Sequence, residues 1–231
     1  MVLVHALGSS RRAWASQIEA LSGRHRVFAP DLPGHGDAKG PFTLDRAVES
    51  VHATIIQGAE KAHVVGISVG AVVALLTCLK HPADVASLAL SGGLAHPPRW
   101  LVLQRMMTQL TPESLYVRAS VGMYSGGRSE HANTAVEDLR RCGKHTLVAG
   151  LHQLAGIDLR QRLSQVAVPT LVLCGSKDRA NIPLSRELAA GIPAAELKIV
   201  GGATHLWNLQ QPQEFNRMVA EFVQRTASHE S

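Results

Sequence analysis

The stretch from His63 to Leu76 constrains the fold of this 231-residue chain more than any other. It opens with a β-branched run, reads Gly66-Ile67-Ser68-Val69-Gly70 at its centre, and closes with small apolar residues of helical character. A turn that lifts a serine hydroxyl off a strand end strains the serine backbone and crowds the residues two before and two after it. Glycine at both places removes the Cβ atoms that would collide. The stretch therefore predicts a strand, a sharp turn at Ser68, and a helix whose N-terminal amides face the hydroxyl.

Strand and helix patterns alternate on both sides of this turn. Short apolar strands are predicted at residues 2–4, 27–29, 63–67, 85–90, 169–175 and 197–200, with amphipathic helices between most of them. This alternation predicts an α/β fold with a mostly parallel sheet covered by helices on both faces. From about Ala95 to Ser164 the pattern is helical only. We therefore expect a core formed by residues 1–94 and 165–231, with residues 95–164 inserted as a helical cap.

Composition limits the classes of partner. The chain is 45% hydrophobic and 18% charged, which is typical of a soluble globular protein. No segment approaches 18 uninterrupted apolar residues, so no membrane partner is predicted. The net charge of +5 is diffuse, without the basic and aromatic cluster that nucleic-acid binding requires, so no nucleic-acid partner is predicted.

Cysteine and histidine usage argues against a metal or a disulfide framework. The three cysteines are odd in number and have no ligand-like spacing, and the twelve histidines show none either. We expect reduced thiols, no metal and no cofactor. The segment Met1-Val2-Leu3-Val4-His5 lacks a basic start and a cleavage region, so a cytoplasmic location is predicted.

Three chemically complementary residues each follow a predicted strand. In an open parallel sheet, catalytic groups collect beyond the carboxyl ends of the strands. Ser68, Asp178 and His205 occupy such places, and they supply the hydroxyl, the carboxylate and the imidazole that nucleophilic acyl chemistry needs. Taken singly, His205 would be a loop histidine and Asp178 a solvated turn carboxylate. His5 and His35 are expected to shape loops by hydrogen bonding.

With these motifs in place, the sequence resembles the α/β-hydrolase family over nearly its whole length. The matching segments are His5-Ala6-Leu7-Gly8-Ser9-Ser10 with Trp14, Asp31-Leu32-Pro33-Gly34-His35-Gly36, Gly66-Ile67-Ser68-Val69-Gly70, Gly175-Ser176-Lys177-Asp178, and Gly202-Ala203-Thr204-His205 with Pro212 and Phe215. The resemblance implies Ser68 as nucleophile, Asp178 as acid and His205 as base. It also implies an oxyanion hole formed by the backbone amides of Leu7 and Val69.

Substrate contacts are predicted from the helical block and from the residue beside His205. Trp100, Met123, Tyr124 and Leu206 are the candidates. At helical spacing such residues are more often core than pocket lining, so the two interpretations stay open.

The chain departs from the family pattern in two places. Ala6 stands where the family usually has glycine, and the chain begins at the strand that usually follows a β-hairpin. The strand predicted at 27–29 would then lie at an uncovered sheet edge, through which two copies could associate.

The function predicted is a serine hydrolase that cleaves a small ester or lactone through an acyl-enzyme on Ser68. Two alternatives keep the fold and change the substrate: a carbon–carbon bond hydrolase, and a methyl-ester hydrolase acting on carrier-bound acyl chains. A third is a non-catalytic, ligand-binding member of the family, since fold does not fix function.

Overall fold

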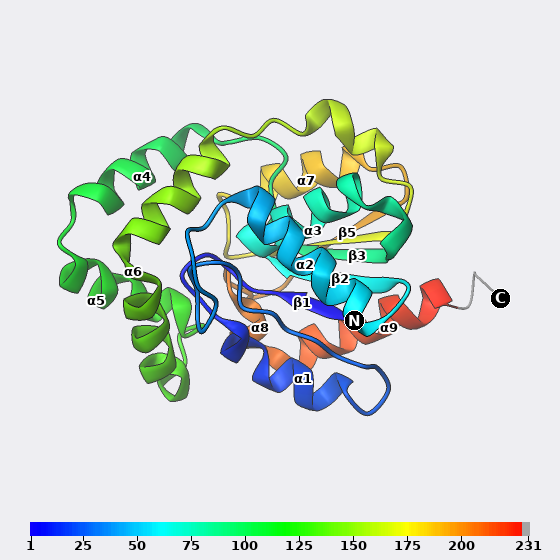
Figure 1. The fold of residues 1–231 in the computed structure, drawn as a ribbon, viewed down its shortest axis with the longest axis horizontal. Coiled ribbons are helices and arrows are strands. Elements are labelled where there is room, and N and C mark those ends of the chain that lie inside the picture. The colour runs from blue at the N-terminus through cyan, green and yellow to red at the C-terminus, as the bar shows by residue number, and fades with distance from the viewer. Residues whose placement is uncertain (228–231) are drawn as a thin grey trace.

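A computed structural model describes residues 1–227 and has a five-stranded sheet at its centre (Figure 1). The strands lie in chain order, β1-β2-β3-β4-β5, and every neighbouring pair is parallel. The parallel arrangement brings the carboxyl ends of all strands to one edge of the sheet. The strands are β1 (Val2–Val4), β2 (Ala62–Ile67), β3 (Val85–Ser91), β4 (Thr170–Gly175) and β5 (Ala195–Val200).

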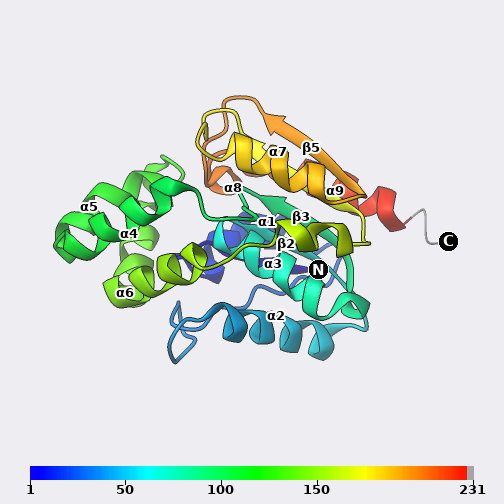
Figure 2. The ribbon, with the colours of Figure 1, turned by 90° about the horizontal axis from the view of Figure 1, so that it is seen from above.

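Helices cover both faces of the sheet, as the alternation predicted. Val2 and Val4 point into one apolar cluster and Leu3 into another, because successive side chains of a strand point to opposite faces. Figure 2 shows α2, α3 and α7 side by side over the first face, and Figure 1 shows α1 and α9 beneath the second. These helices are α1 (Ala15–Leu21, after the 3₁₀ turn Arg11–Trp14), α2 (Leu44–Gly58), α3 (Val69–Lys80, before the 3₁₀ turn Pro82–Asp84), α7 (Ile182–Gly191), α8 (Trp207–Gln210) and α9 (Pro212–Ala227).

The segment between β3 and β4, described throughout, contains helices and no strand. Its helices α4, α5 and α6 lie to one side of the sheet in both views, at the left of Figures 1 and 2. We call residues 95–164 the helical insertion; its division from residues 1–94 and 165–231 as a separate domain stays a prediction. Its helices are α4 (Arg99–Leu110), α5 (Glu113–Tyr124), a 3₁₀ turn (Ser129–His131), α6 (Ala132–Ala155), which kinks at Gly143, and a 3₁₀ turn (Arg160–Gln165).

The strand predicted at 27–29 is wrong. Phe28 forms only an isolated parallel bridge with Val2, because Leu3 donates to the Phe28 carbonyl at 2.8 Å and the Phe28 amide donates to Met1 at 3.0 Å. Pro30 has no amide hydrogen to continue the pairing and restricts the residue before it. The Phe28 ring instead packs on Gly58 at the end of α2, where a Cβ would lie 2.5 Å from the ring. Association of two copies through this edge stays a prediction.

Among residues 1–227, none of the helices combines the length and the apolar character that a bilayer span requires.

Candidate active site

The turn between β2 and α3 has the strained geometry that the glycine spacing predicted. Ser68 has φ 57° and ψ −122°, and within residues 1–227 it is the one non-glycine residue with a positive φ. A Cβ on Gly66 would lie 2.2 Å from the carbonyl oxygen of Gly70, and a Cβ on Gly70 would lie 2.0 Å from that of Val4. Both positions therefore require glycine. The turn leaves Ser68 partly exposed at the end of α3.

A carboxylate and an imidazole face each other across the ends of β4 and β5. His205 Nδ1 lies 2.6 Å from Asp178 Oδ2, and the side chains are 22% and 10% exposed. Asp178 occupies a turn after β4, and His205 follows Ala203, whose carbonyl accepts the Lys177 amide at 2.9 Å. This backbone bond joins the two turns. The pair is therefore held by main-chain contacts as well as by its own hydrogen bond.

Two neighbours of this pair were not predicted from the sequence. Asn181 Nδ2 donates to Asp178 Oδ1 at 2.8 Å, so the second carboxylate oxygen is also bonded. Gly92, with φ +59°, lies against the imidazole, since a Cβ there would be 3.0 Å from His205 Cε1. In the sequence, Asn181 is recognisable only by its place three residues after Asp178, and Gly92 by the Ser91-Gly92-Gly93 turn after a predicted strand. Neither pattern predicts a contact with the Asp178–His205 pair.

One cavity of about 250 Å³ brings together all nine residues predicted for the site. Its walls come from the carboxyl ends of the strands and from α4, α5 and α6 of the helical insertion. Most of the remaining lining is apolar, so the cavity has a few polar groups in a hydrophobic surround, as small-molecule sites usually do. The nine are Leu7, Ser68, Val69, Trp100, Met123, Tyr124, Asp178, His205 and Leu206, and the others are Ala6, Val72, Gly92, Leu94, Leu101, Gln104, Leu151, Leu154, Ala180 and Asn181.

The backbone amides of Leu7 and Val69 belong to residues that line the same cavity. Among the described residues, neither amide has a hydrogen-bond acceptor. Val69 is the first residue of α3, where amides have no partner within the helix. Leu7 lies in the loop after β1, residues 5–10, which we call the Leu7 loop.

Two buried histidines hold the Leu7 loop. The Leu32 amide donates to His5 Nε2 at 2.9 Å, and the Gly8 amide donates to His35 Nε2 at 3.0 Å. Each ring also contacts a backbone carbonyl through Nδ1, so both rings are neutral with the proton on Nδ1. Burial lowers the pKa of His5 and lowers that of His35 to about 3. Both histidines therefore shape loops, as predicted.

A possible metal-ligand group lies elsewhere, between α2 and the end of α3. Ligand atoms of Glu49, His52 and His81 lie within 4.8 Å of one another. Lys80 Nζ already contacts Glu49 at 2.8 Å, and Asp84 contacts His52 Nε2 at 3.0 Å. The group lies at the opposite end of α3 from Ser68.

Comparison with known proteins decides the family. A sequence model described as the alpha/beta hydrolase family matches residues 1–218. The chain belongs to the alpha/beta hydrolase family, and it is an enzyme. Among its alpha/beta hydrolase relatives, one from Azorhizobium caulinodans, named for carbamate hydrolysis (RutD), is 31% identical over 96% of this chain and 90% of its own length. A pimeloyl-[acyl-carrier protein] methyl ester esterase from Neisseria meningitidis is 28% identical over 96% of this chain and 92% of its own length.

Solved structures of alpha/beta hydrolases share the architecture. A hydrolase from Pseudomonas aeruginosa superposes with a TM-score of 0.85 at 25% identity, covering 96% of this chain and 88% of that one. The enol-lactonase from Burkholderia xenovorans superposes with a TM-score of 0.84 at 23% identity, and the match covers 96% of this chain and 90% of the enol-lactonase chain. The predicted fold class is therefore confirmed.

Proposed function

We propose that this alpha/beta hydrolase cleaves a small carboxylic ester or lactone through an acyl-enzyme on Ser68. The observation that best supports the proposal is the Asp178–His205 pair, which opens into the same cavity as the strained Ser68 turn. A hydroxyl, an imidazole and a carboxylate in this arrangement are the components of nucleophilic acyl transfer.

The first half of the reaction acylates the serine. Asp178 accepts a hydrogen bond from the Nδ1–H of His205, and this tautomer leaves Nε2 free to take the proton of the Ser68 hydroxyl as its oxygen attacks the ester carbonyl. The carbonyl oxygen becomes an oxyanion that accepts hydrogen bonds from the amides of Leu7 and Val69. His205 then returns the proton to the leaving alkoxide, and the carbon–oxygen bond to it breaks. The product is an alcohol and an acyl ester on Ser68.

The second half releases the acid. His205 removes a proton from water, the hydroxide attacks the acyl carbon, and the same two amides hold the second oxyanion. Its collapse breaks the bond to Ser68, whose oxygen regains the proton from His205. Each cycle consumes one water and leaves the enzyme unchanged. A lactone follows the same steps, and the alcohol stays attached to the acid as one product.

The cavity favours a neutral, mostly apolar acyl group. Leu94, Leu151 and Leu154 are apolar parts of its wall, and Trp100 and Met123 from the helical insertion add large side chains. The titratable groups in the lining are Asp178, His205 and the phenol of Tyr124, whose pKa burial raises well above its usual value. Among the described residues that line the cavity there is no lysine or arginine, so an anionic acyl group would find no permanently charged cationic partner there.

A methyl ester on a carrier-bound acyl chain is the second candidate substrate. It is supported by the 28% identity over 96% of this chain to the Neisseria meningitidis esterase named for that reaction. Because one relative is named for carbamate hydrolysis, a carbamate is also a substrate to test. Turnover of a vinylogous diketone would test for cleavage of a carbon–carbon bond. The non-catalytic alternative is wrong, because the chain is an enzyme.

A serine probe and a substrate panel test the proposal together. A fluorophosphonate should label the wild type and Ser114→Ala, an exposed serine of α5, but not Ser68→Ala. Turnover should be measured on p-nitrophenyl esters of increasing chain length, lactones, a carbamate, the diketone, and methyl esters with and without a carrier. Equal labelling of wild type and Ser68→Ala would remove the acyl-enzyme assignment.

A further inference from the structure

Helix α6 packs directly against the Leu7 loop. A Cβ on Gly150 of α6 would lie 2.4 Å from Leu7 Cδ1, so the Leu7 side chain rests on the helix surface. On the loop side, a Cβ on Gly8 would lie 2.8 Å from Leu147 Cδ2 and 3.1 Å from Leu139 Cδ2, both of α6. The loop that carries the Leu7 amide therefore has the strand end on one side and the helical insertion on the other.

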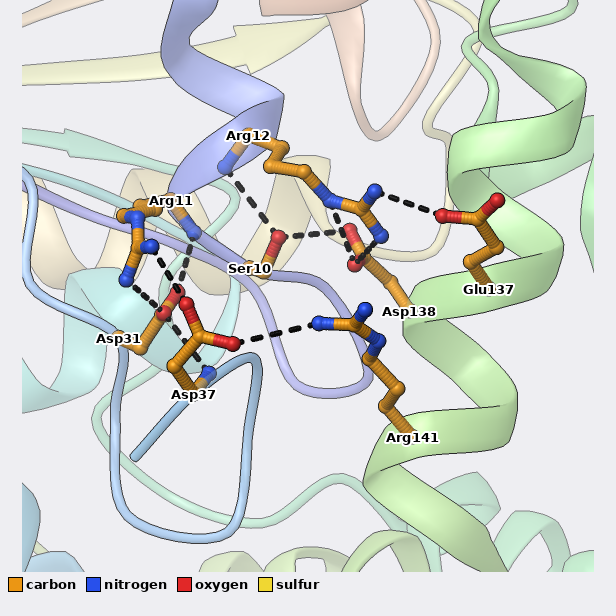
Figure 3. Close-up of polar contacts among 8 residues, drawn as sticks. All are labelled: Ser10, Arg11, Arg12, Asp31, Asp37, Glu137, Asp138 and Arg141. Carbon is orange, nitrogen blue, oxygen red and sulfur yellow. Dashed lines mark hydrogen bonds and ion pairs between the residues drawn. The ribbon is translucent and has the colours of Figure 1, made fainter. Parts of the chain in front are cut away.

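A buried carboxylate on α6 adds directional bonds to this apolar contact. Asp138 is 3% exposed, and Figure 3 shows it between Ser10 and Arg12. Ser10 Oγ donates to Asp138 Oδ2 at 2.8 Å, and Arg12 Nε and Nη2 both donate to Oδ1, the first at 3.1 Å. Ser10 Oγ in turn accepts the Arg12 amide at 3.2 Å, which caps the 3₁₀ turn after the loop. One oxygen of the carboxylate is therefore bonded to Ser10, the last residue of the Leu7 loop, and the other to Arg12 in the 3₁₀ turn that follows the loop.

Arginine from α6 makes a second connection nearby. Arg141 Nη1 lies 3.2 Å from Asp37, and Arg11 bridges Asp37 and the buried Asp31 (Figure 3). The Asp37 contacts are exposed, so they contribute little by themselves. Asp138 differs because its charge is buried, and losing a partner of a buried charge is costly. It is the group that can fix the register of α6 against the loop.

We propose that Asp138 is a positioning residue for the oxyanion-hole amide of Leu7. Through Ser10 and Arg12 it holds the end of the Leu7 loop, while Leu139, Leu147 and Gly150 hold its middle. Apolar contacts allow small sliding movements, whereas hydrogen bonds from a planar carboxylate fix direction, and an oxyanion hole depends on donors placed within a few tenths of an ångström. The helical insertion thus contributes to the chemical step and not only to the shape of the cavity. The inference rests on the proposed function.

Asp138→Asn tests the role with little change of volume. Its amide group cannot accept all three donors, so the loop end should loosen. We expect kcat on a short p-nitrophenyl ester to fall about tenfold, short of the 10²–10³ lost when an oxyanion donor itself is removed, with KM within about twofold. Glu137→Gln is the matched control, because Glu137 is the neighbouring residue, binds the same arginine and has a 57% exposed side chain. Its kcat should equal that of the wild type.

Binding of two inhibitors separates positioning from a general structural defect. An alkyl boronic acid forms a tetrahedral adduct that uses the oxyanion hole, whereas the matching carboxamide binds the cavity without that adduct. Asp138→Asn should weaken the boronic acid in proportion to kcat/KM and leave the carboxamide unchanged. Equal weakening of both inhibitors would indicate a distorted cavity and overturn the proposal.

Ser10→Ala is a second test variant, in which the buried Asp138 carboxylate keeps its ion pair with Arg12. It should give a smaller loss of kcat with the same inhibitor pattern, and the double variant should lose less than the product of the single losses. If Asp138→Asn fails to fold, this variant carries the test. Fluorophosphonate labelling of Ser68 distinguishes the failures: an unlabelled enzyme contradicts the proposed function, whereas a labelled enzyme with wild-type kcat in Asp138→Asn and Ser10→Ala contradicts only this inference.

Discussion

Both oxygens of the Asp178 carboxylate accept hydrogen bonds, one from His205 and one from Asn181. An amide in its place could accept only one of them, and its NH₂ group would face a donor. Asp178→Asn should therefore keep the fold but misorient the imidazole. By analogy with the serine-protease triad, where this substitution was measured, we expect a loss of roughly 10⁴ in kcat. Steady-state kinetics on a p-nitrophenyl ester, with a thermal melt to verify folding, measure the effect.

The control for this substitution is Asp158→Asn. Asp158 has a 52% exposed side chain, and within residues 1–227 its ion-pair partner is Arg160, two positions further along the chain. Its activity should match that of the wild type. An Asp178→Asn variant within a few-fold of wild-type kcat would show that another carboxylate serves His205.

Gly92 gives a second test at the residue scale. A methyl group there would press on His205 Cε1 at 3.0 Å and would also sit at a strained φ of +59°. Gly92→Ala should lower kcat by an order of magnitude or more because the ring must turn away from Asp178. Gly127→Ala separates strain from contact, since its φ is +76° and nothing lies within 4 Å. That variant should lose stability without a matching loss of kcat; equal activity of the two variants would contradict the assignment.

Ser68, Asp178 and His205 line one cavity, and each is placed by a local pattern at the end of a strand. The glycine spacing identifies Ser68, and the ends of two strands identify Asp178 and His205. Asp138 lies within α6, 128 residues from Ser10, and no local pattern links a helical aspartate to a distant loop. Asn181 was missed for a similar reason. Periodicity and motif spacing in the sequence do not predict residues whose role depends on a tertiary contact.

At the scale of elements, the Leu7 loop depends on two neutral histidines, which makes its stability depend on pH. The unfolded chain takes up a proton on His35 near pH 6.5, whereas burial lowers the folded-state pKa to about 3. Between these values the unfolded state binds more protons, so the free energy of unfolding falls as pH falls. The slope is about 1.4 kcal/mol per pH unit for His35 alone, and His5 adds in the same direction.

Denaturant titrations at pH 7, 5.5 and 4.5 measure this slope. His35→Gln offers an acceptor that does not titrate, so the variant should be less stable at pH 7 but less sensitive to acid. His152→Gln changes an exposed histidine of α6 and should leave the wild-type slope in place. An unchanged slope in His35→Gln would show that other groups govern acid unfolding.

Helices α4 and α5 set the size of the cavity through Trp100 and Met123. Both side chains line it, and both are also partly open to solvent at 39% and 43% exposure. Met123→Ala should move the preferred acyl chain toward longer esters by one or two methylenes, each worth about 1–3 kcal/mol of discrimination in an apolar pocket. The ratio of kcat/KM across a C2–C10 ester series measures the shift. Leu115→Ala, exposed on the same helix and outside the cavity, should leave the ratios unchanged.

Most elements are predictable from the sequence because their patterns are local. The strands predicted at 63–67 and 85–90 match β2 and β3 closely, and the Thr43 side chain caps α2 by accepting the Arg46 amide. The strand at 27–29 fails because its apolar run has the right composition but is followed by proline. The packing of α4, α5 and α6 over the strand ends follows from no pattern in those helices. This packing depends on shape complementarity between side chains that are far apart in the sequence, and periodicity within one helix does not report it.

At the scale of the whole molecule, the face of the sheet covered by α1 and α9 joins the two ends of the described chain. Phe215 of α9 packs on Trp14 at 5.7 Å and on Trp207 at 4.7 Å between ring centroids. All three are fully buried. Phe215→Ala should lower the free energy of unfolding by about 3–5 kcal/mol, because it removes a large side chain from a packed cluster.

Equilibrium unfolding in guanidinium, followed by tryptophan fluorescence, measures this loss. Glu221→Ala lies on the exposed side of the same helix and should change the free energy of unfolding by no more than about 0.5 kcal/mol. A loss below about 1 kcal/mol in Phe215→Ala would mean that the cluster repacks around the missing ring.

The contact between α1 and α9 also has a consequence for synthesis of the chain. Gln17 Nε2 donates to Asn216 and Asn216 donates to the Ser16 carbonyl, so bonded partners are 199 and 200 positions apart. At 5–20 residues per second, α9 leaves the ribosome roughly 10–40 s after α1. During that interval Trp14 and Leu21 lack their cover, while β2, β3 and α3 can already assemble. The nascent chain therefore exposes apolar side chains on this face of the sheet until α9 has been synthesised. We expect chaperones to bind the nascent chain mainly during this interval.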